Sequence, residues 1–400
     1  MNRLVKLFAL FILCITSYGA AFAEDIYMQA FAPRSATILA QGGSFTAVSR
    51  GYEALFTNPA GFAASRGSLT LMVNPWVYGN PKDLLISAGA MEAPADYNGP
   101  TTTFNDPTGI SDYLAYASKG GVGAGSGFGL GWSGRGLGLG IISSTDLFMF
   151  GNPFPGGVKG YIQSDVALIA GLGLTLADSK LVTLKLGADI RPTIRFYSPL
   201  TANTLLDMLA NTDNSNPLNS TFMYSGSALA LDAGIQGTLF ENLLFGLSVR
   251  DIFNTRYDMT QYPLGDWLEE ASRGNLPSGG PSASGTYMVP MNISAGLGYH
   301  LDTGALSWLV DPTFHVELAD PLGVIRDNKS PWALLHIGTE TKVLRFISLR
   351  AGLNQGYVTA GAGIKLLFLD INMAAFTREL GRYAGDQSSS GFAMEVALRF

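Results

Sequence analysis

The chain has 400 residues, of which 47% are hydrophobic and 14% charged, and its formal net charge is −6. A soluble protein of this length carries more charge, and the negative balance argues against nucleic acid as a partner. No stretch beyond the N-terminus offers the roughly 18 apolar residues of a membrane helix, so this composition favours a transmembrane β-barrel, in which lipid-facing side chains occupy alternate positions.

The first 23 residues predict a secretory signal peptide. Arg3 and Lys6 form a basic start, residues 7–15 are apolar, and Ala21-Phe22-Ala23 is a small-x-small cleavage site. The chain's one cysteine, Cys14, lies in the apolar part. The mature chain is therefore expected to be exported and to contain neither a disulfide nor a reactive thiol.

Residues 24–67 form a distinct segment ahead of the first predicted strand. The segment is too long for a disordered leader, and it ends with Asn58-Pro59-Ala60-Gly61. Asn before Pro initiates a turn, Pro59 fixes φ, and Gly61 permits an unusual backbone conformation. Taken alone, these four residues predict only a turn.

Residues 68–400 are predicted to form a single antiparallel transmembrane β-barrel, an all-β fold of about fourteen strands. Alternating segments supply the strands. They are 68–78, 126–133, 135–146, 161–176, 181–196, 222–239, 242–257, 286–300, 305–318, 332–343, 347–355, 357–366, 369–378 and 391–400.

Loop lengths support this strand count. Long connections follow the odd-numbered strands and short turns follow the even ones, with one exception at Gly356, where the turn is tight. Long loops at one rim and tight turns at the other are typical of outer-membrane barrels with both termini in the periplasm. A further alternating segment, residues 83–90, would break this arrangement and is left in a loop.

Charged residues of both signs recur on the faces that alternation assigns to the lumen. In the strand 181–196, for example, the polar face carries Asp189, Arg191 and Arg195, and Arg250 lies on another inner face. Wall charges that pair with one another explain this pattern most simply. The alternative is that Arg191, Arg195 or Arg250 binds the carboxylate of a ligand in the lumen.

One glycine motif resembles a cofactor site but does not predict one. Residues 129–134 match Gly-x-Gly-x-x-Gly, yet they lie in a run, residues 121–140, where glycine recurs at nearly every second position. No helix pattern or acidic partner follows, as a dinucleotide site requires. The run instead predicts a hairpin with very small side chains on one face, where another part of the chain packs close.

No catalytic or metal site is predicted. The three histidines are scattered along the chain, at His300, His315 and His336, and no Gly-x-Ser-x-Gly surrounds a serine. Neither the histidine spacing of a zinc site nor a calcium-like loop is present. We therefore expect a protein that is not an enzyme and that needs no cofactor.

The last ten residues alternate between apolar and polar and end on Phe400. Residues 392, 394, 396, 398 and 400 are apolar and point one way, as in a strand with lipid on one side. A final aromatic residue at the end of such a strand predicts an assembly signal for the outer membrane.

The signal peptide, the stretch from Ala54 to Ala63 around Asn-Pro-Ala-Gly, and the terminal strand together resemble the FadL-type outer-membrane transporters and their PorV-like relatives. The resemblance implies that residues 24–67 are a hatch inside the barrel and that Asn58, Pro59, Ala60 and Gly61 shape its turn. It implies passive transport of a hydrophobic small molecule, typically a long-chain fatty acid, with release sideways through the wall.

The same resemblance implies outer-membrane lipid and the barrel assembly machinery as partners. It also leaves a second reading open, a PorV-like scaffold that binds secretion or surface proteins. A porin for polar solutes is the third reading, and the segment ahead of the barrel argues against it.

Overall fold

A computed structural model describes residues 29–79, 120–151, 158–201, 222–273 and 283–400, and residues 86, 92 and 94 singly. The predicted signal peptide lies outside these residues. The strands are β1 (Ser68–Tyr78), β2 (Val122–Gly134), β3 (Leu137–Gly151), β4 (Val158–Asp178), β5 (Val182–Thr201), β6 (Phe222–Leu239), β7 (Leu243–Arg250), β8 (Thr255–Pro263), β9 (Ala283–Val289), β10 (Asn292–His300), β11 (Val310–Ala319), β12 (Leu335–Val343), β13 (Ile347–Asn354), β14 (Tyr357–Leu366), β15 (Leu369–Glu379) and β16 (Ser388–Arg399).

Helices in the described ranges are short. They are α2 (Ala36–Leu39), η1 (Thr46–Val48), η2 (Gly51–Phe56), η3 (Pro59–Ala63), α6 (Leu264–Ser272), η5 (Gly304–Leu306), α7 (Pro321–Arg326) and η6 (Pro331–Leu334). Within the described part of the chain, none of them has the length and apolar character needed to cross a membrane.

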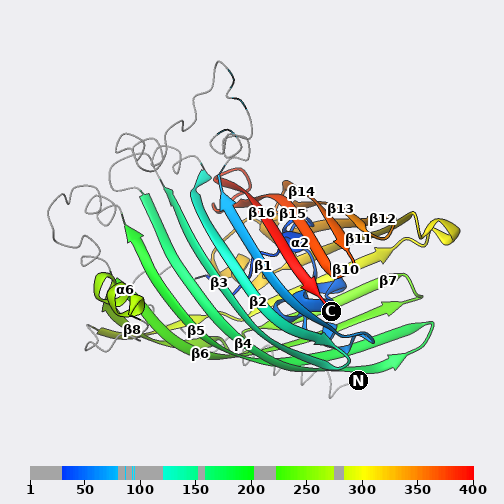
Figure 1. Cartoon of the computed structure of the whole chain (residues 1–400), viewed down its shortest axis with the longest axis horizontal. Coiled ribbons are helices and arrows are strands. Elements are labelled where there is room, and N and C mark those ends of the chain that lie inside the picture. Colours follow the sequence, from blue (N-terminus) through cyan, green and yellow to red (C-terminus); the bar gives the residue numbers. More distant parts are fainter. Residues whose placement is uncertain are drawn as a thin grey trace.

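The strands form one antiparallel sheet that closes on itself (Figure 1). Neighbours in sequence pair around the ring, β16 pairs with β1, and β5 pairs with β6 to complete the closure. Strands β7 and β8 both pair with β6. On their other side, β10 pairs with β7 and β9 pairs with β8. Thus β7–β8 and β9–β10 are two interrupted wall strands, and the wall has the fourteen strands that alternation predicted.

The interruption of the β7–β8 strand is a wide bulge. Between Arg250 and Thr255, three residues other than glycine have positive φ, namely Asp251 at 54°, Phe253 at 67° and Asn254 at 62°. Asp and Asn tolerate this left-handed conformation better than most residues, whereas Phe does not. The bulge therefore holds local backbone strain that its surroundings must offset.

The two rims of the barrel differ as predicted. One rim carries tight turns, such as Arg135–Gly136 with φ of 55° and 83°, the conformation of a two-residue hairpin turn. The other carries the long connections, α6, α7 and η6, together with the tight turn at Gly356. Strand β1 begins and β16 ends at the short-turn rim, where the Leu69 amide donates to the Phe400 carbonyl at 2.9 Å.

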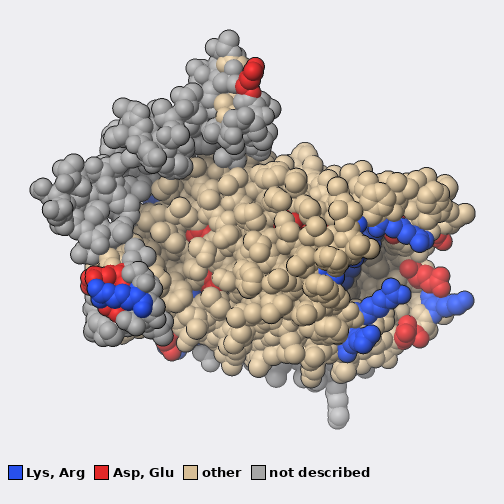
Figure 2. All heavy atoms as spheres, viewed as in Figure 1, with Lys and Arg blue, Asp and Glu red and all other residues tan. Residues whose placement is uncertain are grey.

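The wall is apolar outside and polar inside. In β5, Ile190 and Ile194 are exposed on the outer face, whereas Asp189, Arg191 and Arg195 are buried on the inner face, as predicted. Figure 2 shows a wall almost without charged side chains between its rims. An outer surface of this kind is stable only against lipid, so the fold is a transmembrane barrel.

Residues 29–67, here called the N-terminal segment, lie inside the ring (Figure 1). Its short helices contact different parts of the wall: α2 touches β14–β16, η2 touches β1–β3, η3 touches β2–β6, and η1 touches β6, β7, β10 and β11. Most of its side chains from Phe31 to Ala63 are buried. The segment therefore spans the lumen and contacts the wall on all sides.

Several predicted strand ends were wrong. Strand β11 begins at Val310 and not at residue 305, because residues 304–306 form the 3₁₀ helix η5. Strand β12 begins after η6, which Pro331 starts. Strands β3 and β5 continue to Gly151 and Thr201, past their predicted ends, since strands at the long-loop rim extend beyond the region of clear alternation.

Candidate functional site

The carboxamide of Asn58 anchors the N-terminal segment to the wall. Its Nδ2 donates to the carbonyl oxygens of Thr46 at 3.0 Å, of Ile235 at 3.0 Å and of Leu247 at 3.4 Å. Its Oδ1 accepts from the Ala60 amide at 3.1 Å and so caps η3, which Pro59 begins. Asn58 is fully buried. The turn predicted from sequence thus contacts β6 and β7 directly.

A row of paired glycines lets this turn approach the wall. Gly173, Gly187 and Gly234 lie opposite one another on β4, β5 and β6. A Cβ at Gly187 would lie 2.1 Å from the Pro59 carbonyl oxygen, and one at Gly234 would lie 1.9 Å from Asn58 Oδ1. The segment therefore rests on bare strand backbone, which only glycine permits here.

The glycine-rich run in β2 and β3 has the role predicted from its small side chains. A Cβ at Gly129 would lie 1.5 Å from the Tyr52 hydroxyl, and one at Gly138 would lie 2.5 Å from the Phe62 ring. The hydrophobic side of the N-terminal segment, with Leu55 and Phe56, packs against this part of the wall. The run is a docking face for the segment.

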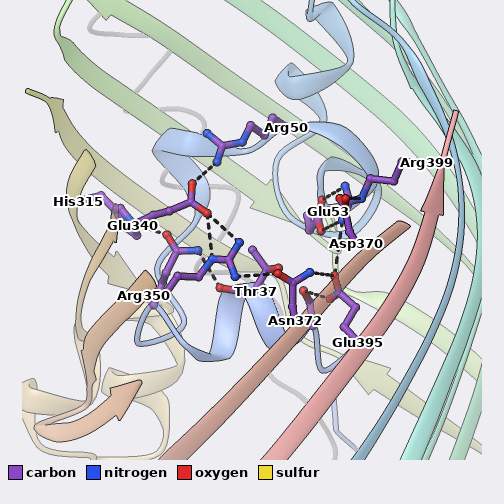
Figure 3. Close-up of polar contacts among 12 residues, drawn as sticks. Thr37, Arg50, Glu53, His315, Glu340, Arg350, Asp370, Asn372, Glu395 and Arg399 are labelled. Atoms are coloured by element: carbon purple, nitrogen blue, oxygen red, sulfur yellow. Dashed lines mark hydrogen bonds and ion pairs between the residues drawn. The ribbon is translucent and has the colours of Figure 1, made fainter. Parts of the chain in front are cut away.

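On the opposite side, charged and polar groups join the segment to β12, β13, β15 and β16 (Figure 3). Glu340 accepts from Arg350 Nε at 2.9 Å and from Arg50 of the segment. Asn372 links Arg350 to Glu395, with distances of 2.8 and 3.0 Å. This chain of contacts continues across the wall from β12 to β16 without an apolar gap.

A second part of the same network centres on Arg399 (Figure 3). Its Nη2 lies 2.9 Å from Glu53 Oε1 of the segment, and its Nε lies 2.9 Å from Asp370. Burial alone raises the pKa of the Glu53 carboxyl, but the adjacent Arg399 guanidinium outweighs that effect and holds the pKa below its ordinary value. Glu53 is therefore ionised and tied to the last strand.

Helix η1 is held by a wall carboxylate. Glu317 Oε2 accepts from the amides of Phe45 and Thr46, each at 2.8 Å, and Oε1 accepts from the Thr46 hydroxyl at 2.9 Å. His315 on the same strand contacts Ser44 and Gln41, each at 2.9 Å. An anion at the first amides of a helix satisfies donors that have no other partner.

Arg191, a predicted lumen residue, is fully buried and bridges two carboxylates. Its Nε lies 3.1 Å from Asp232 on β6, and its Nη2 lies 2.9 Å from Asp251 in the bulge. The Phe31 ring of the N-terminal segment lies over the guanidinium, 5.1 Å from it. Arg191 thus joins the segment, β6 and the bulge.

The other predicted arginines are placed differently. Arg195 pairs with Asp165 on β4 at 2.5 Å and lies under the Tyr257 ring. Arg250 reaches Asp232 at 3.6 Å, so it shares a carboxylate with Arg191. Nη1 of Arg191 and of Arg195 has no hydrogen-bond partner among the described residues. Wall pairing, the simpler expectation, accounts for most of their charge.

Aromatic side chains line the lumen toward the long-loop rim. They form one buried cluster with contributions from β1, β3, β4, β5, β8 and β15: Trp76, Tyr78, Phe148, Tyr161, Tyr197, Tyr257 and Phe376. Arg378 lies between the rings of Tyr78 and Phe148, 4.7 Å from each. Among the described residues, Arg378 forms no ion pair, and its Nε has no hydrogen-bond partner.

Phe400 follows β16 at the short-turn rim. Its amide donates to the Leu69 carbonyl at 2.8 Å, and its ring stacks on Phe368 with centroids 5.9 Å apart. The side chain is 67% exposed, so it faces out of the wall. An aromatic residue at this level belongs to the girdle that marks a membrane interface.

The sequence indicated which charged residues face the lumen better than it indicated which groups they contact there. Alternation predicted that Arg191, Arg195 and Arg250 face the lumen, but the register between neighbouring strands, which a single sequence does not reveal, decides which carboxylates they meet. Asp251 and Glu53 were not singled out. The sequence does carry one sign of Asp251: together with Asn254 it interrupts the alternation of apolar and polar residues.

No family model matches the chain, and no curated protein matches its sequence. Solved structures do resemble it. The Ralstonia pickettii toluene transporter TbuX gives a TM-score of 0.47 at 11% identity, over 92% of this chain and 98% of that one. A Pseudomonas aeruginosa FadL homologue gives 0.47 at 12%, over the same shares.

The Pseudomonas putida toluene transporter TodX gives a TM-score of 0.44 at 12% identity, covering 92% of this chain and 98% of its own. Each of these alignments covers nearly the whole length of this chain. What those proteins carry is a property of those proteins, and the function of this chain is inferred from its own residues.

Proposed function

We propose that this chain is an outer-membrane transporter that passes hydrophobic small molecules, long-chain fatty acids among them, through a plugged barrel. The observation that carries the proposal is the aromatic lining of the lumen. A porin has a polar, water-filled interior, whereas here Trp76, Tyr78, Phe148 and their neighbours form a buried aromatic cluster within an otherwise polar lumen, with the polar ends of Trp76 and Tyr78 turned to Asp146. Aromatic faces with a few placed polar groups are the usual lining of a site for a mostly apolar molecule.

Arg378 supports a ligand that also carries a carboxylate. A guanidinium between two aromatic rings and without an ion pair in the described part of the chain is free to pair with a ligand anion. Arg191 and Arg195 remain candidates through their free Nη1 atoms. A fatty acid, with one carboxylate and an apolar chain, matches this combination.

In this proposal the N-terminal segment is the hatch. Many polar contacts hold it, and each contributes only about 0.5–1.5 kcal/mol to stability. A few of these contacts can therefore break and let the segment move while the barrel stays folded. A ligand that binds the shifted state better would open the route without an energy source. The ligand then leaves sideways into the membrane, and the signal peptide and Phe400 serve export and assembly.

The direct test is uptake by cells that lack their own long-chain fatty acid transporter. Cells that express this chain should accumulate radiolabelled oleate faster than cells with an empty vector, and Arg378→Leu should slow oleate more than an uncharged hydrocarbon. A porin expressed to the same level is the control. Equal uptake with and without the chain would overturn the proposal and turn the search to protein partners of a scaffold.

The hatch role has its own test. Replacing Asn58 and Pro59 with Ala removes the donors to Ile235 and Leu247 and the start of η3, while the wall strands keep their ladders. The double variant should fold but change the rate of oleate uptake. Uptake at the wild-type rate would contradict a hatch function for this turn.

A further inference from the structure

A polar pocket lies inside the ring at the short-turn rim, against the N-terminal segment. Its volume is about 390 Å³, within the range of small-molecule sites. The segment forms one side of it, and the rim ends of β5, β6, β7, β10, β11 and β12 form the others. Figure 2 shows charged side chains of both signs around a hollow at this rim. The aromatic cluster lies toward the other rim, so the two sites are separate.

Three cationic side chains reach the pocket from different elements: Arg50 of the segment, Lys185 of β5 and Lys342 of β12. Lys185 is paired across the ladder with Gln236, whose Nε2 donates to the Ala47 carbonyl at 2.8 Å, so it lies beside η1. Arg50 and Lys342 are close enough to repel each other. An anion between them would offset that repulsion.

The two lysines differ from Arg50 in their partners. Arg50 donates to Glu340, which also pairs with Arg350, and half of the Arg50 side chain is exposed, which leaves N–H groups accessible. Lys185 and Lys342 form no ion pair or side-chain hydrogen bond with any residue that the structure describes. Both are partly buried. A partly buried ammonium gains more from a bound anion than one in open water.

Two carboxylates also line the pocket. Asp311, the ladder partner of Lys342, lies 3.4 Å from His300 Nε2, and Glu241 is exposed in the turn between β6 and β7. Three cations against two carboxylates leave the lining with a positive excess, which a monovalent anion would balance. A carboxylate is monovalent, whereas a phosphate carries more than one negative charge near pH 7.

The rest of the lining suits a carboxylate that carries a short hydrocarbon part. Thr183 and Thr238, paired across β5 and β6, offer hydroxyl groups that can donate to carboxylate oxygens. Val48 of η1 and Leu244 of β7 add aliphatic surface to the same pocket. A few polar groups beside an apolar wall are the usual means of orienting a small ligand.

We propose that this pocket binds the carboxylate of a small aliphatic acid from the aqueous side of the short-turn rim, and that the bound anion joins Arg50 of the segment to Lys185 and Lys342 of the wall. Because these cations lie on separate elements, the anion adds contacts that a shift of the segment would break. Binding therefore stabilises the segment in its present position by mass action. The inference does not depend on what the barrel transports.

Calorimetric titration of the purified full chain in lipid nanodiscs with sodium butyrate tests the site. Lys185→Gln and Lys342→Gln should each raise the dissociation constant about tenfold, because each removes a charge-assisted hydrogen bond. Lys365→Gln is the matched control, since Lys365 lies near the same rim at the end of β14, outside the pocket. Butan-1-ol and inorganic phosphate are the comparison ligands.

Hydrogen exchange of the wild type gives a readout that needs no variant. Butyrate, but not butan-1-ol, should raise the protection of residues 45–50. No butyrate binding by the wild type, or unchanged affinity in both folded pocket variants, would overturn the site. Phosphate binding in place of butyrate would overturn the assignment to a carboxylate. Butyrate binding that leaves the protection of the segment unchanged would overturn the bridge.

Discussion

At the scale of single residues, Glu53 is the charge that ties the N-terminal segment to the last strand. Its carboxylate is buried and 2.9 Å from Arg399. Glu53→Gln keeps the size of the side chain but removes its charge. We expect the contact between the segment and β16 to weaken by about 1.5–3 kcal/mol, the net value of a hydrogen bond to a charged group. Arg399 stays in place because it keeps its ion pair with Asp370. Limited proteolysis and hydrogen exchange of residues 45–60 would measure this.

The matched control is Glu269→Gln in α6, which removes one partner of an exposed ion pair with Arg273, the residue after that helix. Exposed pairs contribute little, so this variant should leave the segment protected. Equal protection in Glu53→Gln and wild type would mean that the contacts of Asn58 and Glu317 hold the segment without help from Arg399.

Glu53 also sets a pH dependence. Its pKa in the folded protein is below the ordinary value of about 4.3. The ionised form therefore contributes stability that is complete above the ordinary pKa and is lost only as the pH falls through the lower folded value. Arg50, Tyr52, Glu395, Asp370 and Arg399 are the charged or titratable groups around it.

We therefore expect the hydrogen-exchange protection factors of the N-terminal segment, which are corrected for the intrinsic effect of pH on exchange, to stay constant from neutral pH down to about 4.3 and to fall only below that. Glu53→Gln should lack this acid step. An acid step of the same size in the variant would assign it to Glu395 or another carboxylate of the network.

At the scale of elements, the close approach of η3 to the wall depends on the absence of side chains. Gly234→Ala would place a Cβ 1.9 Å from Asn58 Oδ1, and overpacking of this kind costs about 1–3 kcal/mol. We expect the turn to be displaced and the segment to exchange faster, with the barrel folded. Gly285→Ala on β9, where a Cβ meets nothing within 4 Å, is the control.

Much of the element pattern could be predicted from the sequence, because lipid and lumen impose opposite polarity on alternate residues. That rule gave fourteen wall strands and the inward face of Arg191. It predicted one unbroken strand across the bulge at Asp251–Asn254, because a local break of four residues hardly changes a long alternating segment. The partners of Glu53 and Arg191 depend on strand register across the closed ring, which no local pattern encodes.

At the scale of the whole molecule, the N-terminal segment occupies the lumen that the wall encloses. Barrels of eight strands are filled by their own side chains, whereas those of about 16 leave an aqueous channel. This wall has fourteen strands, and its lumen is occupied by residues that contact β1 to β7 and most of the remaining strands. The wall itself closes through its own strand ladders, in which β16 pairs with β1 and β5 pairs with β6.

Deletion of residues 31–63 should therefore leave a folded barrel whose inner charges, such as Glu317, Glu340 and Arg350, become hydrated. In planar bilayers we expect the wild type to show no steady ion conductance and the deletion variant to conduct. Heat-modifiable mobility on gels would confirm that the variant is folded. A folded but non-conducting variant would mean that the aromatic cluster around Tyr78 and Phe148 seals the lumen, and that the segment positions ligand without acting as the barrier.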